Sequence, residues 1–213
     1  MHGQRFAMPP TVHILILAAG SSSRMRGADK LVEMIGGRPL LRRVAEVALA
    51  TGAPVTVTLP PANDARRAAL AGLSLQWVDV PDANMGMSRS LRHGIKAVLG
   101  RSPGPADGVM ILPADMPGFT TVALSGLIAR FQADPQPILR GCSAVGQPGH
   151  PILFPRDLWA DLALIEGDEG GRSVLKTHAS RVRLIPLPGT MATFDLDTPE
   201  DWAAFRDGPA ASD

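Results

Sequence analysis

The sequence has very few cysteine and aromatic residues. Among its 213 residues it has one cysteine and no tyrosine, and aromatic side chains make up 4% of the chain. Because Cys142 stands alone, no internal disulfide bond and no cysteine-based metal cluster can form. A single cysteine agrees with a reducing compartment, so we expect a cytoplasmic protein.

An excess of one charge and a long hydrophobic run are also missing. The 21 lysines and arginines nearly balance the 20 aspartates and glutamates, which gives a formal net charge of +1. This balance argues against the basic surface typical of nucleic-acid-binding proteins. The apolar run at residues 14–19 is far shorter than the ~20 residues of a membrane-spanning helix, and residues 1–10 lack the apolar stretch of a signal peptide. We therefore expect no nucleic acid and no membrane as partner.

What the chain does have is a regular alternation of strand-like and helix-like segments. The segment at residues 12–17 is apolar almost throughout, which is typical of a strand buried on both faces of a parallel sheet. Pro39 stands where a first helical residue tolerates proline, and apolar residues then repeat at helical spacing as far as Gly52. Further strands are expected at residues 54–59, 75–80 and 108–113, and helices at residues 64–70 and 88–99.

The second half of the chain is less regular. Its order of strands and helices predicts, with the first half, a three-layer α/β/α fold around a mostly parallel, Rossmann-like sheet. Hydrophobic residues make up 45% of the chain, enough for a sizeable core, and we expect a single domain over residues 1–213 with loose termini at 1–11 and 207–213. The expected elements are short strands at 137–139, 152–154 and 182–187, helices at 158–165 and 173–180, and a last helix opening at Pro199.

A loop suited to phosphate binding follows the first predicted strand. Gly20 and the serines at residues 21–23 allow a tight turn in which successive backbone N–H groups point toward an anion. Arg24 and Lys30 add two cations, which would spread the charge of a transferring phosphoryl group. A glycine loop alone is more often an ordinary turn with solvated bases. The two cations and a later carboxylate favour the phosphate site.

Carboxylates at two other places complete a candidate metal site. Asp115 follows the predicted strand at 108–113 and precedes Pro117, so its carboxylate would lie at the end of a strand. Asp195 and Asp197 would project to one face of an extended segment. Mg²⁺ prefers a few carboxylate oxygens together with substrate phosphates, so we expect Asp115 and one of the pair, taken as Asp197, to hold it. The pair could also start the helix that follows, with an aspartate or threonine cap.

Polar residues before a predicted helix are candidates for the base or ribose pocket. Gly86 allows a ligand to approach the backbone closely, and Asn84 and Ser88 can form hydrogen bonds with the edges of a base. Ser88 could equally serve only as a helix cap. We expect Asn84, Gly86 and Ser88 to contact the nucleotide.

Two further residues are candidates for contact with a second substrate. His150 could touch an acceptor, although a lone histidine more often braces a loop. The glycine-rich segment at residues 167–172 precedes a helix and could form a second anion site, with Arg172 bound to a phosphate of the acceptor. The alternative is a glycine-rich turn with a solvated Arg172.

Six short motifs of this sequence together resemble one family of enzymes. They are Leu17-Ala18-Ala19-Gly20 with Arg24 and Lys30, Gly86-Met87-Ser88, and the segments at residues 112–117, 149–151, 167–172 and 195–201. This combination is similar to the molybdenum cofactor cytidylyltransferases, within a nucleotidyltransferase group that includes the guanylyltransferases of the same cofactor. The resemblance spans about residues 14–202 and implies a sheet of the nucleotide-diphospho-sugar transferase type.

The resemblance also implies a reaction. The terminal phosphate of molybdopterin carrying molybdenum would attack the α-phosphorus of CTP, expel pyrophosphate and form molybdopterin cytosine dinucleotide, with Mg²⁺ as cofactor. A recipient molybdoenzyme is a further partner that the resemblance allows. A phosphate nucleophile is already ionised at neutral pH, so the protein mainly positions groups and neutralises charge. The cations and carboxylates of this sequence fit that task.

Carried over onto this sequence, the family's roles fall on the loop and on the later carboxylates. Arg24, Lys30 and Asp115 would be catalytic, and Asp115 and Asp197 would bind the metal. The acceptor would meet His150, Arg172 and Asp195. The nucleotide would be bound by Leu17, Ala18, Ala19, Gly20, Ser21, Arg24, Lys30, Asn84, Gly86 and Ser88.

Two details of the loop bear on specificity and on the limits of the resemblance. In the family, alanine at the third position of Leu-Ala-Ala-Gly goes with cytidylyl enzymes and glycine with guanylyl relatives, so Ala19 favours CTP. The commoner pattern also has glycine directly after Met25. Here Arg26 comes first, so the loop is one residue longer before Lys30.

Three other functions are compatible with parts of the pattern. The same chemistry could act on another phosphorylated acceptor, such as a sugar or polyol phosphate. A nucleotide-binding chaperone that delivers a cofactor would share the loop but lack turnover. A dinucleotide-dependent oxidoreductase would need Gly-x-Gly-x-x-Gly, which is absent because Gly20 is followed by three serines and Arg24.

Overall fold

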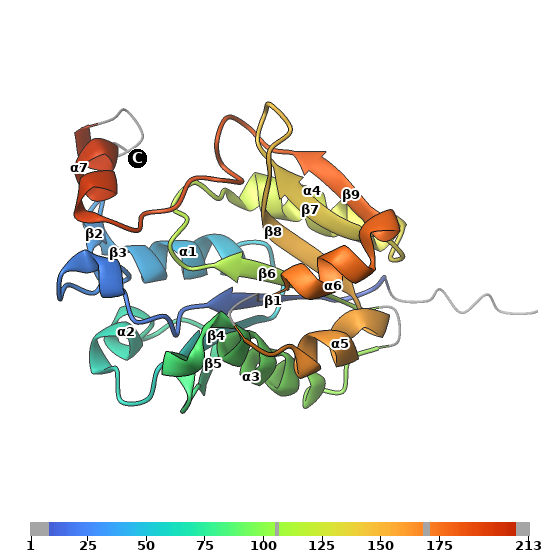
Figure 1. The fold of residues 1–213 in the computed structure, drawn as a ribbon, viewed down its shortest axis with the longest axis horizontal. Coiled ribbons are helices and arrows are strands. Elements are labelled where there is room, and N and C mark those ends of the chain that lie inside the picture. The colour runs from blue at the N-terminus through green and yellow to red at the C-terminus, as the bar shows by residue number, and fades with distance from the viewer. Residues whose placement is uncertain (1–8, 105–106, 168–170, 208–213) are drawn as a thin grey trace, which may run out of the picture.

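A seven-stranded sheet with helices on both faces forms the centre of the molecule (Figure 1). The computed structural model describes residues 9–104, 107–167 and 171–207. The sheet has the order β5-β4-β1-β6-β8-β7-β9, and β2 and β3 form a separate two-stranded sheet. The strands are β1 (Val12–Leu17), β2 (Met34–Ile35), β3 (Arg38–Pro39), β4 (Val55–Leu59), β5 (Gln76–Asp79), β6 (Gly108–Pro113), β7 (Ile138–Cys142), β8 (Pro148–Pro155) and β9 (Val182–Pro186).

Helices of one to four turns connect these strands. The α-helices are α1 (Leu40–Leu49), α2 (Asp64–Ala69), α3 (Met87–Leu99), α4 (Thr121–Ala133), α5 (Trp159–Leu164), α6 (Arg172–Thr177) and α7 (Pro199–Asp207). Short 3₁₀ turns are η1 (Ser23–Met25), η2 (Ala83–Met85), η3 (Arg156–Leu158) and η4 (Ala179–Arg181). Over the described residues, none of these helices combines the length and the apolar character needed to cross a membrane.

The direction of the strands brings several loops to one edge of the sheet. β1 is parallel to both of its neighbours, β4 and β6, and β4 is parallel to β5. β8 is antiparallel to β6 and to β7. The carboxyl ends of β1, β4 and β6 therefore lie together, which is where parallel α/β sheets bind their ligands.

The side chains of β1 alternate between two apolar layers. Ile14 and Ile16 pack with α1 and α4, whereas Leu15 packs with α3 and α5. All three side chains are fully buried. Figure 1 shows α1 and α4 on one side of the sheet and α3 and α5 on the other. A strand covered on both faces has no solvent side, which explains its continuous apolar sequence.

The predicted three-layer fold with a mostly parallel sheet is confirmed. The strands expected in the first half correspond to β1, β4, β5 and β6, and the expected helices correspond to α1, α2 and α3. Several boundaries differ by one residue, and one of these is the start of α1, which begins at Leu40 and not at Pro39. Pro39 has φ −55° and ψ 140° and belongs to β3, where it pairs with Met34 of β2, so it lies outside the helix.

Helix α4 is absent from the elements predicted from sequence. Its signals are nevertheless present, since Thr120 caps the helix by accepting a hydrogen bond from the Ala123 backbone N–H at 3.2 Å. Leu124, Leu127 and Phe131 are buried at helical spacing. The cap and the apolar spacing together would have predicted it.

Strands β7 and β8 are longer than predicted, whereas β9 ends one residue before the expected 182–187. β7 and β8 cover 138–142 and 148–155, where 137–139 and 152–154 were expected. β8 pairs with both β6 and β7, so it continues through the prolines and glycine of residues 148–151 that disfavour an isolated strand. The predicted helix at 173–180 is instead divided into α6 and η4.

Candidate active site

A cavity of about 620 Å³ opens at the carboxyl ends of β1 and β6. The loop after β1, the start of α3, the segment after β6 and the segment before α7 all contribute to its wall. Ser88 is the one predicted site residue outside that wall. The others lie together there: Leu17, Ala18, Ala19, Gly20, Ser21, Arg24, Lys30, Asn84, Gly86, Asp115, His150, Arg172, Asp195 and Asp197.

The loop after β1 is bent by left-handed backbone conformations. Ser22 has φ 52° and is followed by the 3₁₀ turn η1, after which Arg26 also has φ 52°. A Cβ atom placed on Gly20 would meet no atom within 4 Å, so the space beside this residue is open to a ligand. The loop therefore presents its backbone to the cavity beside a free volume.

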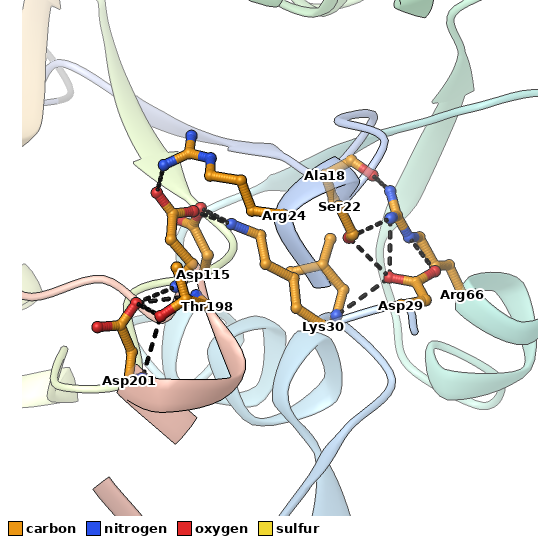
Figure 2. Close-up of polar contacts among 11 residues, drawn as sticks. Ala18, Ser22, Arg24, Asp29, Lys30, Arg66, Asp115, Thr198 and Asp201 are labelled. Carbon is orange, nitrogen blue, oxygen red and sulfur yellow. Dashed lines mark hydrogen bonds and ion pairs between the residues drawn. The ribbon is translucent and has the colours of Figure 1, made fainter. Parts of the chain in front are cut away.

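Residues of this loop form an ionic cluster with two later aspartates, Asp115 and Asp197 (Figure 2). The Lys30 ammonium donates to Asp115 Oδ2 at 2.6 Å and to Asp197 Oδ1 at 2.5 Å. Arg24 Nη1 pairs with the second oxygen of Asp197. Two cations from the loop thus meet carboxylates that follow β6 and precede α7.

The close charges in this cluster shift the pKa values of Lys30 and Asp195. Burial alone would lower the pKa of Lys30, but the charges and hydrogen bonds of Asp115 and Asp197 outweigh it and raise that pKa above its ordinary value. Burial, followed by the charges of Asp197 and Asp115, raises the pKa of the nearby Asp195 carboxyl. The cluster keeps Lys30 protonated and has an excess of carboxylates for one ammonium.

Backbone contacts hold the later pair of aspartates beside Asp115. The Leu196 backbone N–H donates to the Asp115 carbonyl at 3.0 Å, and Asp195 and Asp197 flank that contact. The helix that follows has its own cap, in which Asp201 accepts from the Thr198 hydroxyl at 2.8 Å and the Asp201 backbone N–H donates to Thr198 Oγ1 at 3.1 Å. Threonine caps the helix, and the Asp197 side chain faces Lys30.

The carboxylates fit a hard divalent cation. Asp115, Asp195 and Asp197 each offer an oxygen, and the three oxygens lie within 4.8 Å of one another. Carboxylate oxygens are the donors that Mg²⁺ and Mn²⁺ accept in proteins. Asp195 belongs to this group as well as the predicted Asp115 and Asp197, so the geometry does not separate the later pair.

Ser88 does not lie where the sequence predicted it. Helix α3 begins at Met87 and is preceded by Gly86, whose φ of 108° is favourable only for glycine. Ser88 is therefore no helix cap, and its side chain is fully buried. Met87 and Ser90 line the cavity instead, because residues three apart share one face of a helix.

His150 and Arg172 enter the cavity from β8 and α6. Burial, followed by the charge of Arg140, lowers the pKa of His150 to about 4, so its ring is neutral at pH 7. Its Nδ1 atom is buried and has no hydrogen-bond partner within the part of the chain that the structure describes. Residues 168–170 of the predicted anion site before Arg172 lie outside the described residues.

A second ion pair behind the loop was not predicted from the sequence. Arg66 of α2 is buried and contacts Asp29 Oδ2 through its Nε atom at 2.7 Å (Figure 2). An arginine on a short helix is usually solvated, so nothing in its own surroundings marks it. The usable signal was Asp29, an acidic residue directly before a candidate phosphate-binding lysine.

The sequence matches the family described as MobA-like NTP transferase domain over residues 14–182. The chain belongs to this family. It is thus a nucleotidyltransferase, and the predicted enzyme class is confirmed.

Individual relatives of this nucleotidyltransferase agree with the family. The molybdenum cofactor guanylyltransferase of Rhodopseudomonas palustris is 31% identical over 212 residues, which cover 95% of each protein. The bifunctional protein GlmU of Halorhodospira halophila is 35% identical over 124 residues. The match covers 57% of this chain and 25% of the length of GlmU.

Solved structures of Rv0371c from Mycobacterium tuberculosis H37Rv share the fold of this nucleotidyltransferase. One is 27% identical with a TM-score of 0.79, over 94% of this chain and 100% of that one. A second structure of Rv0371c, in complex with manganese, is 26% identical with a TM-score of 0.72, over 91% and 97% of the two chains. A divalent cation thus binds a protein of this fold, and the Asp115, Asp195 and Asp197 group offers suitable donors for one.

Proposed function

We propose that this nucleotidyltransferase transfers CMP from CTP to the terminal phosphate of molybdopterin carrying molybdenum. The proposal depends on one observation, the pairing of Lys30 with Asp115 and Asp197 beside an open phosphate-binding loop. It extends to Mg²⁺ as cofactor, to a single cytoplasmic domain and to a molybdoenzyme that receives the product. The names of full-length relatives support the molybdopterin acceptor.

The proposed reaction exchanges one phosphorus–oxygen bond for another. An oxygen of the acceptor's terminal phosphate forms a bond to the α-phosphorus of CTP, while the bond to the β-phosphate oxygen breaks and pyrophosphate leaves. Lys30 and Arg24 lie where they would neutralise the triphosphate. When bound, Mg²⁺ would offset further negative charge on the phosphates, held by Asp115 and the later aspartates.

The acceptor would lie against the opposite part of the wall. Arg172 is exposed at the start of α6 and can meet a phosphate, while His150 is neutral and can form a hydrogen bond through its buried Nδ1. These two side chains come from β8 and α6 and not from the nucleotide loop. The cavity thus has a polar group for each of the two substrates.

The choice of CTP is supported by Ala19. In the family that this sequence resembles, alanine at that position goes with cytidylyl transfer. Ala19 is 3% exposed and lines the cavity, so its methyl group takes space that a glycine would leave to a larger base. GTP is the second candidate, because relatives that this chain matches over 89–96% of their own length are named guanylyltransferases.

Pyrophosphate release tests the proposal. Purified protein with Mg²⁺ and molybdenum-loaded molybdopterin should release pyrophosphate faster with CTP than with GTP. Faster release with GTP would replace CTP in the assignment, and release only with a sugar or polyol phosphate would replace the acceptor. Nucleotide binding that survives Asp115→Ala, with no turnover in either form, would instead indicate a cofactor-delivering chaperone.

A further inference from the structure

We infer that Arg66 is a positioning residue that fixes the nucleotide loop and thereby places Lys30. This inference rests on the proposed function, because it concerns how the same cavity binds its nucleotide. It also gives a purpose to the longer segment between Met25 and Lys30. Arg66 comes from α2, which is separate in sequence from the loop that it holds.

Every nitrogen of the Arg66 guanidinium contacts the loop. Nη1 donates to the Ala18 carbonyl at 2.6 Å, at the point where the chain leaves β1. Nη2 donates to Ser22 Oγ at 3.2 Å, at the residue with left-handed backbone. Nε and Nη2 donate to the two oxygens of Asp29 at 2.7 and 2.8 Å. The side chain is only 2% exposed and is absent from the wall of the 620 Å³ cavity. It lies instead beside a smaller hollow of about 230 Å³ that shares residues 20–23 of the loop, so its link to Lys30 runs through the loop.

Asp29 connects this arginine to Lys30. It directly precedes the lysine, and its Oδ1 accepts from the Leu31 backbone N–H at 3.1 Å and from the Ser22 hydroxyl at 3.3 Å. Asn63, which caps α2, donates to its other oxygen at 3.3 Å. The backbone on both sides of Lys30 is therefore held by one carboxylate.

The geometry explains how a longer loop can still place its lysine. An extra residue before Lys30 would allow its ammonium more positions. Figure 2 shows the contacts that limit them: Asp29 pairs with Arg66, and Lys30 pairs with Asp115. Burial would raise the pKa of Asp29, yet the hydrogen bonds and charge of Arg66 lower it, so the pair stays ionic. A planar, two-pronged guanidinium fits this carboxylate, and an ammonium cannot form the same contacts.

A test compares Arg66→Lys with Arg67→Lys. Arg67 is the next residue on α2 and pairs with Asp79 at the surface, so it is a matched control. We expect Arg66→Lys to weaken nucleotide binding about tenfold or more and to lower turnover ~10²-fold, since small misplacements of a positioning group have such effects. Arg67→Lys should stay within about twofold. Asp29→Asn keeps the shape of the carboxylate and serves as the second variant if Arg66→Lys fails to fold.

The readout separates positioning from general stability. Binding of CTP and of GTP is measured by calorimetry on variants whose circular dichroism and cooperative melting match the parent. A double-mutant cycle with Lys30→Ala then asks whether the loss at Arg66 shrinks when Lys30 is gone. Losses that simply multiply, or normal binding and turnover in Arg66→Lys and Asp29→Asn, would overturn the inference. A wrong acceptor leaves the binding data unchanged, and a wrong nucleotide appears as tighter GTP binding by the parent.

Discussion

Lys30 is the side chain on which the ionic cluster depends. Its ammonium contacts two carboxylates at 2.6 and 2.5 Å, and its side chain is 13% exposed. Removing one member of a buried ion pair typically costs about 3–5 kcal/mol, because the remaining charge is left without a partner. Around Lys30 the remaining charges are Asp115 and Asp197, with Asp195 close by, so the loss would fall on the site itself.

Replacing Lys30 by methionine removes the ammonium and keeps the length of the stem. We expect turnover in Lys30→Met to fall ~10²- to 10³-fold, as when a preorganised group that stabilises charge is removed. Pyrophosphate release at saturating nucleotide measures the change. Lys96→Met, at an exposed lysine of α3, is the control and should keep normal turnover. Near-normal turnover in Lys30→Met would separate the cluster from the chemistry.

The start of strand β8 determines where the segment before α7 can lie. The His150 backbone N–H donates to the Ala192 carbonyl at 2.8 Å, and a Cβ atom on Gly149 would lie 1.7 Å from that oxygen. The two backbones can approach this closely only because residue 149 has no side chain. Residues 193–197 continue from this contact to the aspartates of the cavity.

A methyl group at Gly149 should therefore disturb the site from a distance. We expect Gly149→Ala to lose about 1–3 kcal/mol of stability and to lower turnover, because the chain around Ala192 must move away. Urea unfolding and pyrophosphate release measure the two effects. Gly126→Ala is the control, since Gly126 is an exposed residue of α4 whose added Cβ would meet no atom within 4 Å, and the change should be neutral or stabilising. Unchanged turnover and stability in Gly149→Ala would contradict this contact.

Strands and helices could be predicted from the sequence where their own burial pattern determines the local sequence. β1 is buried on both faces, so its nearly continuous apolar sequence indicates a central strand, and the strand was predicted with the observed bounds. β8 was predicted too short, because its pairing with β6 and β7 depends on strands far away in sequence. Pairing of this kind overrides the local preference of Pro148 and Gly149.

At the scale of the whole molecule, two histidines couple stability to pH. Burial, followed by the charge of Arg140, lowers the pKa of His150 to about 4 from 6.5. Burial also lowers the pKa of His13, although Asp107 opposes this effect. An unfolded chain would bind protons near pH 6.5 at positions where the folded protein does not, so acid favours the unfolded state.

We predict that the free energy of unfolding falls as the pH drops from about 6.5 to about 4. His150 alone accounts for a loss on the order of 3 kcal/mol below that window, since each pKa unit corresponds to about 1.4 kcal/mol. Urea unfolding at several pH values measures the slope. In His150→Gln the slope should be smaller, because the substituted side chain binds no proton. An equal slope in the variant would show that the fall has another origin.

The candidate site was predictable in its parts and less so in its assembly. Arg24 and Lys30 follow the glycine loop after a recognisable strand, Asp115 follows another strand and Asp197 precedes a helix start. The structure brings all four together. The role of Arg66 depends on how α2 packs against the loop, which no local pattern records. The expected contact of Ser88 with the nucleotide was misplaced for a related reason. Helix α3 starts at residue 87 and not at 88, and this shift changes which side chains face the cavity.

The ionic cluster joins residues from distant parts of the chain, and this sets an order in time. All seven strands of the central sheet are complete by Pro186, yet Asp195 and Asp197 come later. A chain emerging from the ribosome can thus pair every strand of the sheet before Asp195 and Asp197 are available to the site. Activity should appear only after residues 187–207 have docked onto the finished sheet, so catalysis would report that synthesis has passed this segment.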